Sequence, residues 1–305
     1  KQLAEISDKR IGALLPEDPA GFGNYRGTVG RAFELLVGRT LPSRSTIERA
    51  KGEEQELEGH LFYDESIFIA SLGETLPTYT VFPKNWAGKV AIWTGDRGRD
   101  ILFTSASNLH AGAEGKRQLA EAARELLGKG VAVITADLMG QGTKKIEGLE
   151  PGVQRRVENP REAACYTFCY NDSLLVQQVH DLLTLISYAR DPEHGMPEIL
   201  LIGSGETGAA AAIARLVARE EVASAAIETN GFRFEQIDHY LDRRMLPGSI
   251  KYGDMPAILG LSAPLPLQII GEASVPELTK QVFSAAEAAE EVYSVDELDL
   301  GRLLE

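Results

Sequence analysis

The segment Glu198–Asn230, EILLIGSGETGAAAAIARLVAREEVASAAIETN, constrains the fold more than any other part of the chain. It begins with a short apolar run, passes through a glycine-rich turn, and continues as an alanine-rich helical stretch and a second apolar run. A strand, a tight turn, a helix and another strand in that order form a βαβ unit with parallel strands. The turn is therefore expected at the carboxyl end of a buried strand, where α/β proteins bind their ligands.

The same alternation of apolar and amphipathic segments runs through the rest of the chain. Short apolar runs predict buried strands, and stretches with apolar residues three and four positions apart predict helices. The longest helix is expected to begin after a cap at Asn171 or Asp172 and to stop before Pro192. The expected strands are 89–95, 131–138, 198–203, 224–230 and 266–272, and the expected helices between them are 118–130, 171–190 and 206–221.

The N-terminal part has a different pattern of apolar and polar residues. Residues 1–50 contain one helical stretch, RAFELLVGRTL, and are expected to form a helical appendage. Residues 58–83 are rich in aromatic and β-branched residues around Gly73 and Pro77, which predicts an antiparallel hairpin. Residues 51–305 are therefore expected to form one α/β domain. Its architecture is a three-layer sandwich with a mostly parallel, doubly wound sheet that begins with the hairpin.

Composition excludes some partners. The chain of 305 residues carries 45 Asp and Glu against 31 Lys and Arg, a formal net charge of −14. A protein this acidic, without a basic stripe, is a poor binder of nucleic acid or of an anionic membrane surface. No apolar run approaches the roughly 20 residues that span a bilayer. The histidines show no metal-ligand spacing, so no metal site is expected.

Two properties stay open at this stage. The chain begins with Lys1, so its compartment cannot be read, and a secreted or periplasmic location would follow if an N-terminal segment had been removed. The oligomeric state is likewise not written in the sequence.

The glycine-rich turn has two interpretations. In the first, Gly203, Gly205 and Gly208 form the GxGxxG loop of a dinucleotide-binding fold, with the pyrophosphate at the helix N-terminus. Glu228, at the end of the next strand, would then bind a ribose hydroxyl, and the cofactor would be NAD(P). Strand, helix and acidic residue stand in the required order, which supports this interpretation.

In the second interpretation, the turn is the nucleophile elbow of an α/β-hydrolase, where small residues two before and two after the nucleophile permit a strained backbone. Ser204 and Gly208 are the small neighbours in this register, so Glu206 takes the nucleophile position, with Gly205 and Thr207 on either side of it. Ser204 itself fits less well, because its own neighbours at these two positions would be Ile202 and Glu206.

The order of the segments favours the second interpretation. A dinucleotide fold carries its glycine loop after the first strand, whereas here several strands and a βαβ unit come first. Residues 87–272 also resemble bacterial α/β-hydrolase proteins of the acetyl xylan esterase-like and dienelactone hydrolase-like kind. The segments that carry the resemblance are GKGVAVITADLMGQG, YTFCYNDSLLVQQVHDLLTLISYAR, LIGSGETGAAAAIARL and LPGSIKYGDMPAILGLSAPLPLQIIGE.

The resemblance implies acyl transfer by a nucleophile, a His base, an acid that orients it, and two backbone N–H groups as an oxyanion hole. This chain departs from that pattern at every side chain. The elbow carries Glu206 in place of Ser, and no Asp lies near Ser274, where the acid is expected, although Glu272 is close by. No histidine follows His239. The Ser-His-Asp triad is therefore degenerate.

Other residues remain candidates for catalytic roles. His239, in the insertion GFRFEQIDHYLDRR, is the best substitute base, and its alternative role is that of a surface histidine. Asp96 and Arg97 follow the strand at which this fold supplies half of its oxyanion hole, and Thr207 is the third candidate there. The alternative for Asp96 and Arg97 is a solvated turn. An Arg beside Glu206 would pair with its carboxylate.

Three functional hypotheses follow. The first is an enzyme that needs no cofactor and acts on an ester of a sugar or polysaccharide, with Glu206 at the elbow. The second is a hydrolase-like binding or structural domain without catalysis, which would fit a place in a longer multidomain chain. The third is an NAD(P)-binding oxidoreductase. Activity on an ester that depends on Glu206 or His239 distinguishes the first two, and binding of a nicotinamide cofactor distinguishes the third.

Overall fold

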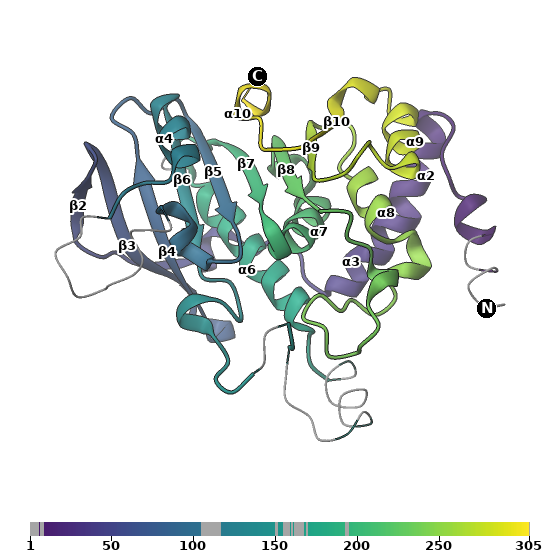
Figure 1. The fold of residues 1–305 in the computed structure, drawn as a ribbon, viewed down its shortest axis with the longest axis horizontal. Coiled ribbons are helices and arrows are strands. Elements are labelled where there is room, and N and C mark those ends of the chain that lie inside the picture. The colour runs from purple at the N-terminus through teal and green to yellow at the C-terminus, as the bar shows by residue number, and fades with distance from the viewer. Residues whose placement is uncertain are drawn as a thin grey trace.

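The structure is a computed structural model that describes residues 6, 9–104, 117–149, 152–154, 159, 161, 168, 170–192 and 195–304. Its strands form one ten-stranded sheet with helices on both faces (Figure 1). The strands are β1 Glu48–Ala50, β2 Glu54–Leu57, β3 His60–Ile69, β4 Glu74–Phe82, β5 Lys89–Thr94, β6 Val131–Ala136, β7 Glu198–Gly203, β8 Ser224–Glu228, β9 Leu267–Ile270 and β10 Val292–Val295.

The sheet order is β1-β3-β4-β6-β5-β7-β8-β9-β10, and β2 pairs with β3. β3 and β4 form the expected antiparallel hairpin, and β4 pairs antiparallel with β6. From β6 to β10 all neighbours are parallel. The structure therefore confirms the mixed α/β class and the mostly parallel sheet. The short strands β1, β2 and β10 were not among the expected elements.

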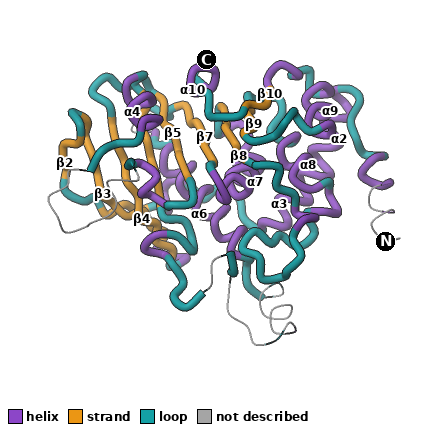
Figure 2. The backbone as a smooth tube through the Cα atoms, viewed as in Figure 1, coloured by secondary structure: helices purple, strands orange, loops and turns teal. Residues whose placement is uncertain are grey.

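The helices form the two outer layers of the molecule (Figure 2). The α-helices described in the 19–304 range are α2 Pro19–Tyr25, α3 Arg31–Val37, α4 Glu121–Gly128, α6 Leu174–Ala189, α7 Gly208–Ala218, α8 Asp254–Gly260, α9 Glu277–Ala285 and α10 Leu300–Leu303. None of the helices in the described part of the chain is long and apolar enough to cross a membrane.

The central strands are buried on both faces, and their side chains alternate between two apolar cores. In β7, Ile199 and Leu201 belong to the core that contains α6 and α7, whereas Leu200 and Ile202 belong to the core that contains α4. This is why such strands read as continuous apolar runs instead of alternating ones. Burial on both faces fixes the strand register, and so it fixes where the loops at the carboxyl ends lie.

The longest helix begins later than expected. Ser173 is the N-cap of α6, and its Oγ accepts a hydrogen bond from Val176 N at 3.3 Å. The prediction of a cap at Asn171 or Asp172 was therefore wrong by one or two residues, because all three residues have side chains that can cap a helix. Burial distinguishes two of these residues, because Ser173 is buried and Asp172 is exposed.

Candidate functional site

The parallel part of the sheet reverses its direction of growth beside β5. The chain passes from β5 through α4 to the neighbouring β6, and then returns through α6 to β7 on the other side of β5. The carboxyl ends of β5 and β7 therefore leave a crevice at a topological switch point, which is where α/β sheets bind ligands. The loops at this crevice begin with Gly95 and Ser204, so the glycine-rich turn lies where the sequence places it.

Side chains of β5 hold the turn in place. Trp93 Nε1 donates to Ser204 Oγ at 3.2 Å, and the hydroxyls of Thr94 and Thr207 lie 3.0 Å apart. Thr207 also donates from Oγ1 to the Ser204 carbonyl at 2.8 Å, and it is fully buried. Ser204 and Thr207 thus stabilise the turn, and neither hydroxyl lines the cavity described below.

Two glycines give the turn its shape. Gly205 has a φ of +59°, a conformation that L-residues with side chains rarely adopt. Gly208 opens α7 so close to β8 that a Cβ there would lie 2.0 Å from the Glu228 carbonyl oxygen. In a nucleophile elbow the nucleophile takes the strained position. Here that position belongs to Gly205, and Glu206 is the next residue along the chain.

Two carboxylates bind the backbone N–H groups of the turn. Glu206 N donates to Asp96 Oδ1 at 2.8 Å, and Gly205 N donates to Glu228 Oε2 at 2.8 Å. Asn230 Nδ2 holds the second oxygen of Glu228 at 2.8 Å. The other oxygen of Asp96, Oδ2, would lie 2.4 Å from a Cβ at position 205. Asp96 therefore fills the space in which a side chain at 205 would otherwise lie.

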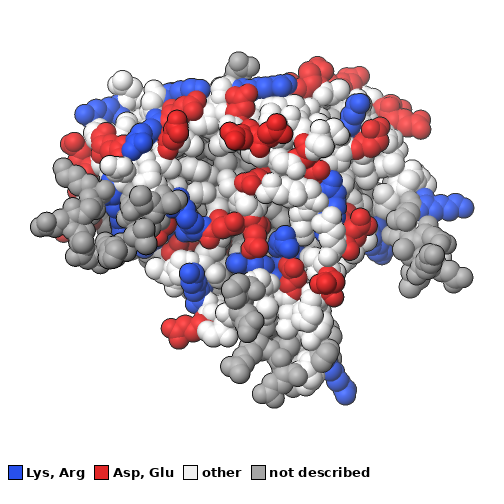
Figure 3. Space-filling model, viewed as in Figure 1, with Lys and Arg blue, Asp and Glu red and all other residues white. Residues whose placement is uncertain are grey.

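A cavity of about 290 Å³ opens beside these carboxylates. On the face shown in Figure 3, acidic and basic side chains lie close together in the lower central part of the molecule. The cavity is lined by Asp96, Gly205, Glu206, Ala209, Glu228, Thr229, Asn230, Phe232, Gln236, Ile237, Arg244 and Met255. Of the expected site residues, it brings together Asp96, Gly205 and Glu206 from the hydrolase interpretation and Glu228 from the dinucleotide interpretation.

Two other expected residues, Arg97 and His239, lie differently from the expectation. Arg97 Nη2 donates to the Phe103 carbonyl at 2.7 Å, so it does not pair with Glu206. The partner of Glu206 is Arg243, with Nη1 3.4 Å from Oε2. His239 is exposed, and its Nδ1 accepts from Leu241 N at 3.2 Å. Among the described residues, no histidine lines the cavity.

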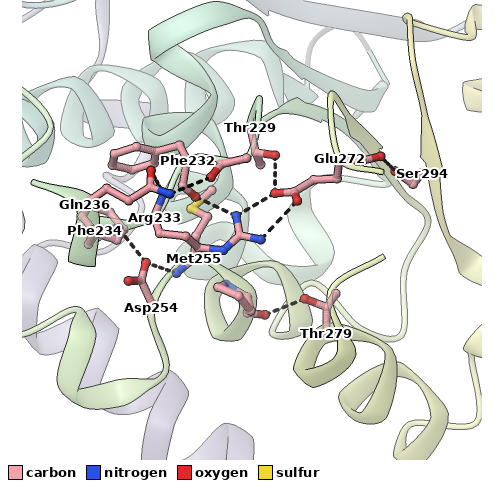
Figure 4. Close-up of polar contacts among 12 residues, drawn as sticks. Thr229, Phe232, Arg233, Phe234, Gln236, Asp254, Met255, Glu272, Thr279 and Ser294 are labelled. Carbon is pink, nitrogen blue, oxygen red and sulfur yellow. Dashed lines mark hydrogen bonds and ion pairs between the residues drawn. The ribbon is translucent and has the colours of Figure 1, made fainter. Parts of the chain in front are cut away.

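Glu272 lies at the end of β9, close to the position where an esterase would hold its orienting acid. Its carboxylate accepts from Arg233 Nη1 at 2.7 Å and Nη2 at 3.1 Å, and from Thr229 Oγ1 at 2.8 Å (Figure 4). Burial raises the pKa of Glu272, but the bonds from Arg233 and Thr229 outweigh burial and leave that pKa below its ordinary value. The charged partner of Glu272 is thus an arginine, and not a histidine.

Sequence reasoning missed the arginines of this site. Arg243 and Arg244 follow His239 in the segment DHYLDRR, which was considered only for its histidine. A pair of arginines in a strongly acidic chain, on an insertion at the carboxyl rim, was the available signal. Arg244 lies with its guanidinium carbon 4.4 Å from the centroid of the Phe232 ring.

The geometry disfavours a nicotinamide dinucleotide. The parallel strands run in the order β6-β5-β7-β8-β9-β10, and the glycine loop follows the third of them along the chain instead of the first. Both turn amides that would face a pyrophosphate are bonded to carboxylates, which would repel it. In the described part of the chain, no group of three or more His, Cys, Asp or Glu residues could hold a metal ion.

Comparisons with known proteins give a structural likeness without a sequence match. No protein-family model matches the chain, and no curated protein matches it. A Bacteroides fragilis protein described as an acetyl xylan esterase superposes with a TM-score of 0.61 at 12% identity, over 92% of this chain and 76% of that one.

Two further solved structures are glucuronoyl esterases. The enzyme from Solibacter usitatus has a TM-score of 0.56 at 12% identity, over 89% of this chain and 87% of its own. The enzyme from Teredinibacter turnerae has a TM-score of 0.52 at 14% identity, over 94% and 80%. At these identities the likeness shows a shared fold.

Proposed function

We propose that this chain, which has an α/β-hydrolase-type fold, binds a carbohydrate in the cavity at its glycine-rich turn and does not transfer acyl groups. The proposal depends on one observation: the Asp96 carboxylate bonds the Glu206 N–H at 2.8 Å and lies against Gly205. Acyl transfer on this fold needs a nucleophile at the strained residue and a free N–H on the next one. Position 205 has no side chain, and the following N–H is already bonded.

The lining of the cavity suits a polyhydroxylated ligand. Carboxylates and side-chain amides are groups that hydrogen-bond to hydroxyls, and Asp96, Glu228 and Gln236 supply both kinds. Met255 and Ile237 add an apolar part against which the C–H face of a sugar ring can pack. The carbohydrate class is supported by the solved structures that share the fold, which are described as esterases of xylan and glucuronoyl groups.

The alternative is an ester hydrolase with Glu206 as nucleophile. Glu206 does line the cavity, and its partner Arg243 would hold its carboxylate in one place. The covalent ester that Glu206 would form must then be hydrolysed by an activated water. His239, the expected base, is not a lining residue and is bonded within its own loop. For this reason binding without turnover is the better-supported function.

The test measures turnover and binding on the same purified protein. Hydrolysis of p-nitrophenyl acetate and of acetylated xylan is followed for the unchanged protein and for Glu206→Gln. Calorimetric titrations with xylotriose, with the glucosamine trisaccharide and with its fully N-acetylated form measure binding. We expect hydrolysis no faster than in buffer, and at least one of the sugars bound with a Kd of about 1 mM or below.

Two results would decide against the proposal. Hydrolysis above the buffer rate that is lost in Glu206→Gln would establish the esterase alternative. A protein that neither hydrolyses the esters nor binds any of the three sugars would have no carbohydrate function at this cavity.

A further inference from the structure

We infer that the preferred ligand of this cavity is an amino sugar, whose protonated amine is bound by Asp96, Glu206 and Glu228. The inference rests on the proposed function, because it names the ligand class of the same cavity. Two properties of the lining residues support this ligand. These are the hydrogen-bond donors and acceptors that they leave for a ligand, and the charges of the side chains at the cavity.

The donors of the lining are already engaged by the protein. Thr229 Oγ1 donates to Glu272, Asn230 Nδ2 to Glu228, and Gln236 Nε2 to the Gly231 carbonyl at 3.4 Å. The guanidinium of Arg244 is directed to Asp242, with Nε 3.4 Å from Oδ1. The two turn amides are bonded to carboxylates. A ligand that needs donors from the protein therefore finds few of them here.

The carboxylates, in contrast, keep accepting capacity, although each oxygen of Glu228 already accepts one hydrogen bond. Asp96 uses Oδ1 for the Glu206 N–H, and its Oδ2 lies over the bare backbone of Gly205 at the cavity wall. The side chain of Glu206 is 46% exposed, and its arginine partner is 3.4 Å away. An ionised carboxylate accepts several hydrogen bonds and donates none. An ammonium group has three donors and no acceptor, so it is the complement of this lining.

The balance of charge points the same way. Three carboxylates line the cavity beside one guanidinium, which is itself paired with Asp242. Arg243 offsets part of the charge of Glu206 but is not a lining residue. The whole chain carries a net charge of −14, which adds a long-range attraction for cations. An anionic sugar would be repelled by the net charge of the chain at long range and by the carboxylates of the lining at short range.

The size and the apolar wall select a ring over a simple amine. The cavity of about 290 Å³ lies near the lower limit of ligand pockets, which suits a single sugar ring. Ala209, Phe232, Ile237 and Met255 form the apolar part of the wall. A linear diamine would satisfy the carboxylates but would leave this surface uncovered.

The experiment uses a matched pair of ligands on the 305-residue chain. Calorimetric titrations compare the glucosamine trisaccharide with its N-acetylated form at mildly acidic pH, where the amines are charged, and at low and high salt. We expect the amine form to bind about tenfold more tightly at low salt, because a charged hydrogen bond is worth more than a neutral one. We expect the difference to shrink at high salt.

Variants locate the effect. Glu206→Gln changes an exposed side chain and keeps its shape. It is expected to weaken binding of the amine form about fivefold to tenfold, and binding of the N-acetyl form less than twofold. Glu235→Gln removes an equal charge from an exposed residue that precedes the lining residue Gln236 but does not itself line the cavity, and it is expected to leave both affinities unchanged.

The outcomes separate this inference from the proposed function. If the N-acetyl form or xylotriose binds as tightly as the amine form, the cavity binds carbohydrate but the amino-sugar inference is wrong. If putrescine binds as tightly as the amine trisaccharide, charge alone is recognised and the inference is also wrong. If none of the sugars binds, the proposed function itself fails.

Discussion

At the scale of single residues, the backbone conformation of Gly205 and the position of the Asp96 carboxylate depend on each other. The positive φ of Gly205 aims the Glu206 N–H at Asp96, and the absence of a Cβ leaves room for the Asp96 carboxylate. Each residue therefore depends on the other for its place. Sequence reasoning assigned Gly205 to the glycine-rich turn and Asp96 to the loop after the strand 89–95. It could not say that the Asp96 carboxylate would bond the Glu206 N–H, because that follows from a 2.8 Å contact between two loops.

The double-mutant cycle of Gly205→Ala and Asp96→Ala tests this coupling. Gly205→Ala places a Cβ at a positive φ and 2.4 Å from Asp96 Oδ2, so we expect it to lower the free energy of unfolding by about 2 kcal/mol or more. In the Asp96→Ala background the steric part of the cost should disappear and only the backbone part remain. Urea unfolding measures the free energy of unfolding of the unchanged protein, of the two single variants and of the double variant. Strictly additive costs would show that the two residues do not interact.

Among the elements, α6 shows how a boundary is decided. Asn171, Asp172 and Ser173 are all residues that cap helices well, and the sequence alone does not choose among them. The structure chooses Ser173 because Leu174 and Leu175 then enter the core as the first turn begins. The elements with strong apolar patterns were predicted within a few residues, whereas β10, with four residues, was too short to give a pattern.

A capping variant measures this boundary. Ser173→Ala removes the hydroxyl that accepts from Val176 N, and it is expected to cost about 1 kcal/mol of unfolding free energy. Asp172→Ala removes a capping-type residue that does not cap the helix, and its cost should lie below about 0.5 kcal/mol. Thermal and urea unfolding compare the two variants. A larger cost for Asp172→Ala would place the cap where the sequence first suggested.

At the scale of the whole molecule, the N-terminal helices and the α/β sheet share a core. Tyr25, Val29, Phe33 and Val37 are buried in the same apolar cluster as α6 and α7, and α3 packs against α6. We therefore propose that the 1–50 appendage stabilises the domain formed by residues 51–305. An amphipathic helix signals an apolar surface to cover, but its sequence does not say which surface that is.

Two residues of α3 test this dependence. Phe33 is fully buried, and Leu35 on the same helix is 67% exposed. Phe33→Ala is expected to lower the unfolding free energy of the whole domain by about 3 to 5 kcal/mol, since it opens a cavity in the shared core. Leu35→Ala should change it by about 0.5 kcal/mol or less. If Phe33→Ala left the main unfolding transition unchanged, the appendage would be independent of the domain.

The sequence by itself determined the class of the fold, the parallel order of the strands that flank the turn, and the gathering of Asp96, Glu206 and the glycines at one end of the sheet. These follow from local pattern, because apolar periodicity fixes the elements and parallel strands carry their loops to the same edge. The residue types alone also predict a degenerate Ser-His-Asp triad.

The tertiary structure decided which groups fill the site. It gave the positive φ to Gly205, the hydrogen bond from the Glu206 N–H to Asp96, the ion pair of the Glu206 side chain to Arg243, and the partner of Glu272 to Arg233. Apart from the conformation of Gly205, which belongs to the turn, each of these pairings joins residues far apart in the chain. Such contacts depend on how loops from different strands pack against one another, and no periodic pattern in the sequence encodes that packing.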